Sequence, residues 1–337
     1  MIDLLNLPAI STPLPWHERE WARLHRQLKD GQLAHALLLV GRQHTGKEQL
    51  AMALSRLLLC AQPGDSLNCG ECHACQLSAT GGHGDFLWVT PKEKSRVIKI
   101  DQVREVVRFT SKTAGFGVRK VIVLAPAESM NVNAFNALLK SLEEPARDTH
   151  LILVCDNMHG VPATIRSRCQ ILHLPTPSAA ASLDWLDRTT GQRELSEKLL
   201  SLSDGLPLLA AELYCSGGAD EFAVRRRALE SLIAGRITVA QASALWGELE
   251  MSAILEQFTA DIQRILVSLS IDRLRTRQGR VLFSLLDEVS QLHRAVSAGS
   301  NPSKQLLLEA LMSKVHRGLG ADLLGDSIPS RTGDPGV

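Results

Sequence analysis

A glycine loop with the sequence GRQHTGKE, at residues 41–48, is the feature that most constrains the fold of this chain. The residues before it, AHALLLV at 34–40, show no alternation of apolar and polar side chains, which is typical of a strand buried on both faces of a sheet. Residues 48–59 after it place four leucines on one side of a helix. A strand, a glycine loop and a helix in this order form the context in which a loop binds phosphate.

The same alternation of strands and helices continues to about residue 175. Strands are expected at 86–89, 118–124, 151–155 and 171–174, and helices at 16–33, 100–110 and 131–144. This pattern predicts an α/β domain whose parallel sheet is covered by helices on both faces. After Pro175 and Pro177 the chain is expected to be helical throughout, without a further strand. The tail at 326–337 has the composition of a disordered segment.

The loop departs from a working phosphate loop at one position. Gly41, Gly46 and Lys47 match the pattern G-x-x-x-x-G-K-[ST], in which backbone amides cradle the phosphates and the lysine neutralises them. Glu48 stands where a hydroxyl residue would bind magnesium, and its negative charge would repel a triphosphate. We expect weak nucleotide binding or none, and no hydrolysis. A glycine turn beside a surface lysine is the alternative interpretation.

A second departure lies at the end of the strand expected at 118–124. ATPases of this architecture carry acidic residues there, which hold magnesium and polarise water. Here the strand ends in Ala125-Pro126, and the next acid, Glu128, is expected to lie in a turn. The two departures together predict a degenerate nucleotide site.

Four of the seven cysteines are clustered in the segment that follows the predicted loop and helix. Cys60, Cys69, Cys72 and Cys75 have the spacing Cys-x8-Cys-x2-Cys-x2-Cys, and thiolates so spaced can form a tetrahedral zinc site. Such a site is structural, because four sulfur ligands leave no position for water. The nearby His73 and His83 are expected to be bystanders. Four incidental thiols are the alternative, although clustered cysteines are usually ligands.

Charge and composition limit the possible partners. The net charge is +1 and aromatic residues make up 4% of the chain, so we expect neither an overall basic field nor a base-stacking surface. The arginine clusters at 225–227 and 273–280 are interpreted as solvated helix faces in preference to DNA contacts. No apolar run is long enough to cross a bilayer, and no secretory pattern is recognised, so a cytoplasmic protein is expected.

Two further runs carry a resemblance to a known family. FNALLKSLEEP at 135–145 and PATIRSRC at 162–169, together with the cysteine spacing, resemble the AAA+ clamp loader subunits of bacterial DNA polymerase III. The resemblance implies a P-loop-type AAA+ domain over residues 1–175, which includes a zinc module at 60–75. It further implies a small helical lid at 176–216 and an all-α collar for oligomerisation at 217–325.

The resemblance also implies roles for individual residues. Gly41, Gly46 and Lys47 match the phosphate loop of the family, and the four clustered cysteines match its zinc ligands. Arg168, in the Ser-Arg-Cys motif, matches an arginine finger that acts in trans on ATP bound by an adjacent motor subunit. Its guanidinium would stabilise negative charge in the transition state. The departures at Glu48 and at the tip of the strand favour a rigid stator over a motor subunit.

The implied partners are gamma or tau motor subunits and a delta subunit in a pentameric ring. The sliding clamp and primer-template DNA would be reached through that complex, which is part of a DNA-directed DNA polymerase, a nucleotidyltransferase. The isolated chain is expected to lack polymerase and ATPase activity. Two alternatives stay open: an ATP-hydrolysing motor subunit of the same fold, and a zinc-dependent nucleic-acid binding protein. ATPase activity of the isolated chain tests the first, and salt-dependent DNA binding tests the second.

Overall fold

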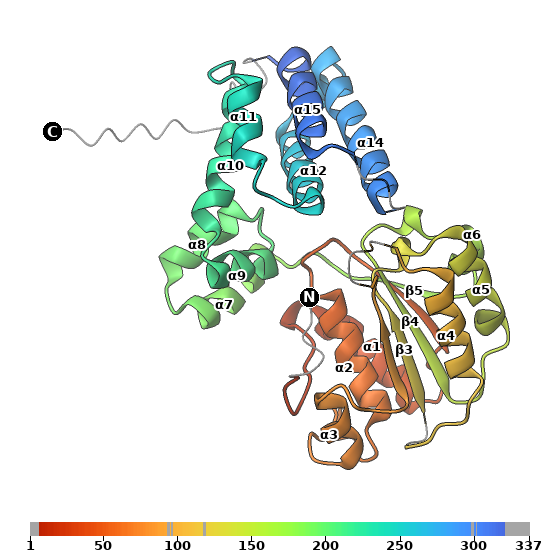
Figure 1. Cartoon of the computed structure of the whole chain (residues 1–337). Helices are drawn as coiled ribbons and strands as arrows, with labels where there is room; N and C mark the ends of the chain where they lie inside the picture. The colour runs from red at the N-terminus through yellow and green to blue at the C-terminus, as the bar shows by residue number, and fades with distance from the viewer. Residues whose placement is uncertain are drawn as a thin grey trace. The chain divides into compact units, whose positions relative to one another are not determined.

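The computed structural model of the protein describes residues 7–92, 95, 97–116, 119–297, 300 and 302–320. The chain divides into two compact units, Met1–Glu212 and Leu213–Val337 (Figure 1). The domain boundaries expected at residues 175 and 216 stay predictions. The tail expected to be disordered, at 326–337, lies outside the described residues, as does residue 118 at the start of a predicted strand.

The first unit contains a parallel five-stranded sheet with the order β2-β3-β4-β1-β5. The strands are β1 (Ala36–Val40), β2 (Phe86–Val89), β3 (Lys120–Leu124), β4 (Thr149–Cys155) and β5 (Gln170–His173). β1 lies between β4 and β5, and all five of its residues are buried. This central position explains why its sequence is apolar without alternation.

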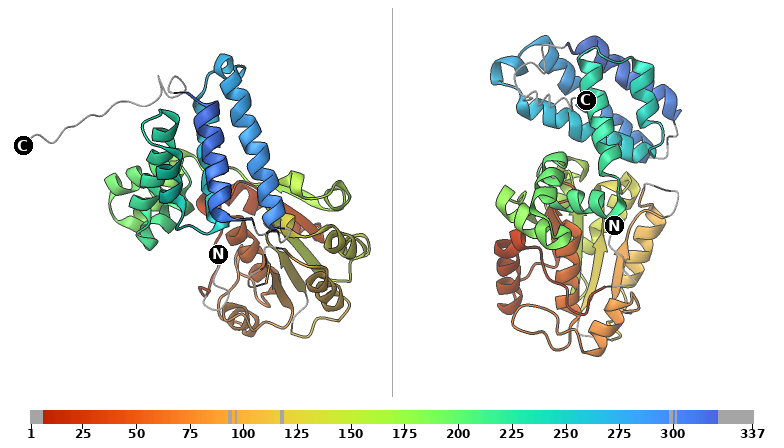
Figure 2. Two further views of the ribbon diagram at one scale, coloured as in Figure 1. Left: turned by 45° about the horizontal axis from the view of Figure 1, so that its top comes forward. Right: turned by 90° about the vertical axis from the view of Figure 1, so that its left-hand side faces the viewer.

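Helices cover both faces of the sheet (Figure 2). α1 (Glu18–Lys29) and α2 (Lys47–Leu59) pack on one face, against strand residues that include Leu37 and Leu39. α4 (Ile100–Thr110) and α5 (Val132–Glu143) pack on the other, against Leu38 and its neighbours. The fold class predicted from the sequence, an α/β domain with a parallel sheet followed by helices, is confirmed.

Shorter elements complete the α/β part of the first unit. They are the 3-10 turns η1 (Pro15–His17), η2 (Ala127–Ser129) and η3 (Met158–Gly160), and the helices α3 (His73–Ala79) and α6 (Ala163–Arg166). The helix expected at residues 16–33 is shorter than predicted. It ends at Lys29 because Gly31 takes a φ of +66°, a conformation that ends helices.

The remaining described elements are helices. α7 (Ala179–Thr190) and α8 (Arg193–Leu202) lie in the first unit, and α9 (Pro207–Ser216) spans the division between the units. The second unit contains α10 (Ala219–Ile233), α11 (Val239–Trp246), α12 (Met251–Ser268), α13 (Ile271–Leu274), α14 (Arg277–Ser297) and α15 (Lys304–Gly318). Among the described residues, no helix is long and apolar enough to cross a membrane.

The second unit has its own hydrophobic core, to which α10, α11, α12, α14 and α15 contribute. The interpretation of residues 225–227 as a solvated helix face is wrong for two of the three arginines. Arg225 and Arg226 are buried, and they bond to Gln257 and Asp261 of α12. The sequence pattern could not show this, because the partners lie on a helix that is distant in the chain.

Candidate functional site

The glycine loop connects the carboxyl end of β1 to the amino end of α2, as the sequence predicted. Gly46 caps α2 with a φ of +91°, and His44 takes a φ of +57°, which is uncommon for a residue with a side chain. Glu48 is in the first turn of α2. Local backbone strain of this kind is often found at ligand-binding loops. The loop therefore has the strand-loop-helix setting in which phosphate-binding loops occur.

Lys47 of the loop forms internal contacts. Its side chain is 1% exposed, and its Nζ lies 2.5 Å from Oδ1 of Asp156 and 2.9 Å from the carbonyl oxygen of Arg42. Asp156 directly follows β4, whose last residue Cys155 is in register with Val40 of the neighbouring β1. An ammonium group paired in this way has its charge balanced by a carboxylate of the same chain. The sequence pattern did not indicate that Asp156 lies beside the loop, because this position follows from the strand order.

A second carboxyl group lies next to this pair. Oε1 of Glu128, in η2, accepts hydrogen bonds from the backbone N–H groups of Asp156 at 2.7 Å and of Asn157 at 3.3 Å. Burial, with the neighbouring Asp156 carboxylate, raises the pKa of Glu128 to about 7. Ala125 and Pro126 follow β3 directly, as expected. The first acid after that strand therefore holds the turn after β4 by hydrogen bonds.

Residues near the N-terminus pack on the outside of the loop. The indole Nε1 of Trp16 donates a 2.8 Å hydrogen bond to the carbonyl oxygen of Thr45. A Cβ added to Gly46 would lie 2.2 Å from Cδ1 of Leu14, so this leucine rests on bare glycine backbone. His17 is fully buried; its burial, with the charge of Lys47, lowers its pKa to about 4 and keeps the ring neutral.

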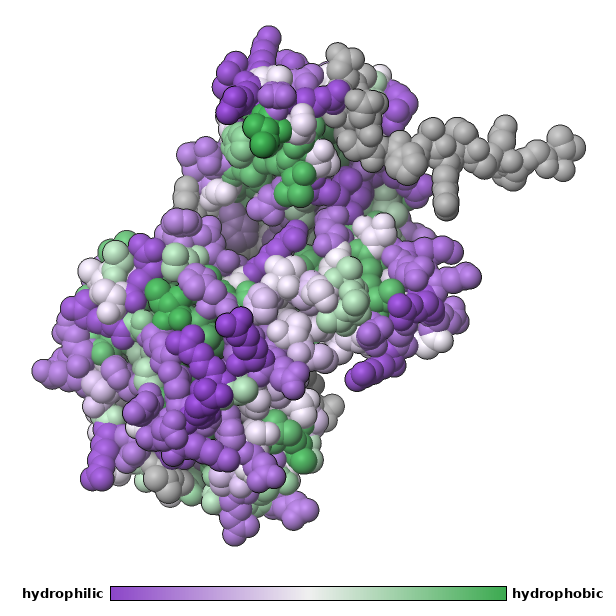
Figure 3. All heavy atoms as spheres, turned by 180° about the vertical axis from the view of Figure 1, so that it is seen from behind, coloured by the Kyte–Doolittle hydropathy of each residue, from purple (hydrophilic) through white to green (hydrophobic). Residues whose placement is uncertain are grey.

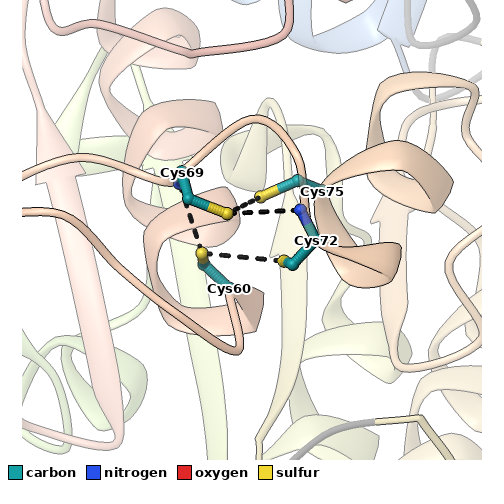
Figure 4. A group of neighbouring side chains, drawn as sticks. All are labelled: Cys60, Cys69, Cys72 and Cys75. Carbon is teal, nitrogen blue, oxygen red and sulfur yellow. Dashed lines mark hydrogen bonds between the residues drawn. The ribbon is translucent and has the colours of Figure 1, made fainter.

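The four clustered cysteines come together at the other end of α2, as predicted. Cys60 caps that helix and Cys72 caps α3, and the four sulfur atoms point toward one another (Figure 4). The Sγ atoms lie 3.8 Å apart for Cys60 and Cys72, and 3.9 Å apart for Cys69 and Cys75. All four ligand atoms lie within 4.8 Å of one another.

These distances suit a tetrahedral metal site. A zinc–sulfur bond of about 2.3 Å places tetrahedral sulfur atoms roughly 3.8 Å apart. The predicted bystanders do not join the cluster. His83 accepts a hydrogen bond from the N–H of Asp85, and the rings of His73 and His83 both lie near Phe116. Among the described residues, the cluster thus offers a metal four sulfur ligands and no histidine.

Arg168 lies between α6 and β5, away from the loop in sequence. Its Nε donates a 2.8 Å hydrogen bond to Oε1 of Glu143, its Nη2 donates to the same oxygen, and its Nη1 donates to the carbonyl oxygen of Thr164 at 2.8 Å. The side chain keeps a third of its surface exposed. The guanidinium is therefore held at the surface by a carboxylate at the end of α5.

Comparisons with known proteins agree with one another. The model of a family described as "DNA polymerase III, delta subunit" matches residues 16–178. The chain is 37% identical over 320 residues to DNA polymerase III subunit delta' of Pseudomonas aeruginosa, which covers 88% of this chain and 95% of the relative. It is 35% identical over 201 residues to the corresponding subunit of Escherichia coli, which covers 59% of this chain and 60% of the relative.

A search of solved structures finds a gamma subunit-related DNA polymerase III protein of Thermotoga maritima. The match has a TM-score of 0.46 and 16% identity, and it covers 88% of this chain and 99% of the other.

Proposed function

Because the chain belongs to the family of DNA polymerase III delta prime subunits, we propose that it is the stator of the clamp loader in this polymerase. In this role it supplies Arg168 in trans to ATP that a neighbouring motor subunit has bound. Its own nucleotide site is degenerate and does not hydrolyse ATP. The complex would use that hydrolysis to load the sliding clamp onto primed DNA during replication.

The ion pair between Lys47 and Asp156 is the observation that most supports a silent nucleotide site. The lysine of a phosphate loop must be available to neutralise the outer phosphates. Here its ammonium group is buried and already balanced by a carboxylate at 2.5 Å. An entering triphosphate would have to displace Asp156 and would meet the carboxylate of Glu48 in the first turn of α2. Both negative charges oppose nucleotide binding.

The surroundings of Arg168 support the finger in trans. Its guanidinium has a planar array of donors that suits phosphate oxygens. Glu143 accepts two of its hydrogen bonds in the free chain. A terminal phosphate of a neighbour could replace this partly exposed carboxylate without leaving the arginine unpaired. Glu143 thus holds the side chain extended until the partner docks.

The cysteine cluster fits a structural zinc ion. Cys60, Cys69, Cys72 and Cys75 would hold the ion, which would supply a rigid crosslink between the end of α2 and the start of α3. Four thiolates fill a tetrahedral coordination sphere, so we assign this site no part in hydrolysis. We assign zinc to the site in preference to softer metal ions, because zinc commonly takes four sulfur ligands in intracellular proteins.

The proposed partners are gamma or tau motor subunits and a delta subunit in a pentameric ring. The second unit carries exposed apolar side chains on several helices, namely Leu245, Val267, Ile271, Phe283 and Leu306. In Figure 3, apolar residues form a patch bordered by hydrophilic ones on this unit. Exposed apolar surface of this kind suits contacts between subunits, which supports the collar role proposed for the region at 217–325.

An experiment on the assembled complex tests the arginine finger. Complexes are assembled from purified motor and delta subunits with either the wild-type chain, Arg168→Ala or Arg104→Ala. Arg104 is a matched control, because it too is a surface arginine with a carboxylate partner, Asp101. We expect DNA-stimulated ATP hydrolysis to fall for Arg168→Ala alone while all three chains assemble. Unchanged turnover with Arg168→Ala would contradict the finger.

The isolated chain distinguishes the proposed function from its two alternatives. Magnesium-dependent ATP turnover by the purified chain would identify it as a motor subunit and would overturn the silent site. Tight binding to DNA with a steep dependence on salt would instead favour a zinc-dependent nucleic-acid binding protein. The stator predicts neither activity.

A further inference from the structure

The two sites in the first unit lie at opposite ends of one helix. Gly46 of the phosphate loop caps the amino end of α2, and Cys60 of the metal cluster caps its carboxyl end. Residues 7–17, which we call the N-terminal strap, contact both ends. A single segment of chain therefore joins the metal cluster to the loop by a route outside the helix.

Arg56 anchors the strap at the cysteine end. It lies in the last turn of α2 and is fully buried. Its guanidinium donates to Oγ of Ser78 and to the carbonyl oxygen of Cys75, both of which lie in α3. It also donates to three acceptors on the strap: the carbonyl oxygens of Pro8 and Ala9, and Oγ of Ser11.

Asn68 forms a second link at the same end. Its Nδ2 lies 3.3 Å from Sγ of Cys75 and 2.9 Å from the carbonyl oxygen of Ala9, and its Oδ1 accepts from the N–H of Ser11 at 2.9 Å. One buried amide thus contacts a metal ligand and the strap at the same time. Gly70 allows the close approach, because a Cβ there would lie 3.2 Å from the Ala9 oxygen.

The other end of the strap rests on the phosphate loop. Leu14 packs on Gly46, and Trp16 donates to the carbonyl oxygen of Thr45. These contacts hold the loop from outside, whereas Lys47 and Asp156 hold it from within. No strap residue is a metal ligand, so any effect of the metal on the loop by this route passes through residues beside the ligands, and Arg56 and Asn68 provide most of the side-chain hydrogen bonds to the strap.

The charge of the metal site makes these links depend on the metal. A divalent ion with four thiolates has a net negative charge, which balances the buried guanidinium of Arg56. Without the ion the four sulfur atoms are no longer held in place, so the carbonyl oxygen and the Sγ of Cys75 lose their fixed positions as acceptors for Arg56 and Asn68. Metal binding and strap docking should therefore favour each other, since coupling between two sites is reciprocal.

We propose that a metal ion in the cysteine cluster holds the N-terminal strap in place against the phosphate loop, an arrangement that we call the latch. The inference rests on the metal site proposed above, and it gives that site a role in holding the loop closed. Loss of the metal would release residues 7–17 and loosen residues 41–46, although the cluster and the loop share no side-chain contact in the structure.

Backbone hydrogen exchange of the full chain, with zinc bound and after chelation, tests the latch. We expect chelation to speed exchange about tenfold or more at the strap, including the N–H of Ser11, and at the loop. Exchange in β4 should stay slow. Zinc-loaded Asn68→Ala should show the same faster exchange in the strap with its metal retained. Asn136→Ala, at an exposed position of α5, is the matched control and should behave as the wild type.

Each outcome decides the proposal. A chain that takes up no zinc overturns both the metal site and the latch. If zinc binds and chelation opens only residues 60–80, with strap exchange unchanged, the latch alone is overturned. Chelation could instead unfold the whole unit, so that amides in β4 also exchange quickly. The zinc-loaded Asn68→Ala variant then tests the latch: an exchange rate at the N–H of Ser11 equal to that of the wild type contradicts it.

Discussion

Oε1 of Glu143 accepts two hydrogen bonds from the guanidinium of Arg168, one from Nε and one from Nη2. The pair joins the end of α5 to the segment between α6 and β5. Both side chains are partly exposed, at 48% and 33%. Pairs in this setting contribute little to folding, because water screens the charges. The fold therefore depends little on this arginine.

This setting predicts that Arg168→Ala folds normally. We expect its free energy of unfolding to lie within about 1 kcal/mol of the wild type, as for other surface ion pairs. Urea denaturation followed by circular dichroism measures the difference. A loss above roughly 2 kcal/mol would show a structural role instead, and it would weaken any conclusion drawn from the variant in the assembled complex.

The buried ion pair in the loop should behave differently. Asp156→Ala leaves the Lys47 ammonium buried with the Arg42 carbonyl as its remaining described acceptor. We expect a loss of about 1–3 kcal/mol, less than for a fully buried pair because Asp156 is partly exposed. Combining it with Lys47→Met should recover part of the loss in a double-mutant cycle. Asp184→Ala, which removes a partner of the exposed Arg193, is the control and should cost less than about 1 kcal/mol.

The raised pKa of Glu128 predicts that the free energy of unfolding depends on pH. Its folded pKa of about 7 exceeds the ordinary glutamate value of 4.5, so the folded state binds the proton more tightly than the unfolded state. Its contribution to stability is therefore full below about pH 4.5 and is lost as the pH rises to about 7. Glu128→Gln should be more stable than the wild type at pH 8, on the order of 2 kcal/mol, and similar at pH 4. Equal stability differences at both pH values would contradict the raised pKa.

The proposed metal site predicts that cysteines inside and outside the cluster differ in their effect on zinc binding. Cys72→Ser should lose zinc and melt at a lower temperature, because structural zinc contributes directly to folding. Cys215→Ser is the matched control, since Cys215 is exposed and lies outside the cluster. Elemental analysis of the purified chains measures the zinc. Lowering the pH should also release the ion, because protons compete for the thiolates. Zinc retained in full by Cys72→Ser would refute the assigned ligand set.

In the second unit, the ion pair of Arg226 with Asp261 predicts a large stability effect. Nε of Arg226 lies 2.7 Å from Oδ1 of Asp261, whose side chain is fully buried. Asp261→Ala would leave buried cations without this partner, and we expect a loss of about 3–5 kcal/mol. Glu288→Ala breaks the more exposed pair with Lys314 and should cost less than about 1 kcal/mol. Thermal unfolding of the two variants compares them directly.

The sequence allowed good prediction wherever the signal was local. The apolar run before the loop predicted β1, and the cysteine spacing predicted the cluster, because its members are close in the chain. The predicted ends of helices were less accurate. α1, for example, ends at Lys29, before Gly31, and not at residue 33 as expected. The family motifs pointed to Arg168, but they did not indicate that Glu143 is its partner. Identifying it as the partner required the packing of α5 beside α6.

Periodicity, glycine positions and cysteine spacing were sufficient to predict the α/β class, the loop and a cluster of cysteines that could hold a metal, since each depends on neighbours along the chain. The pairing of Lys47 with Asp156 was decided by β1 lying beside β4, and the strap contacts of Arg56 by segments that meet only after folding. Burial decided the roles of Arg225 and Arg226 in the same way. A charged residue can be recognised from the sequence, but its partner is set by strand order and helix packing, which bring together residues that are distant in the chain.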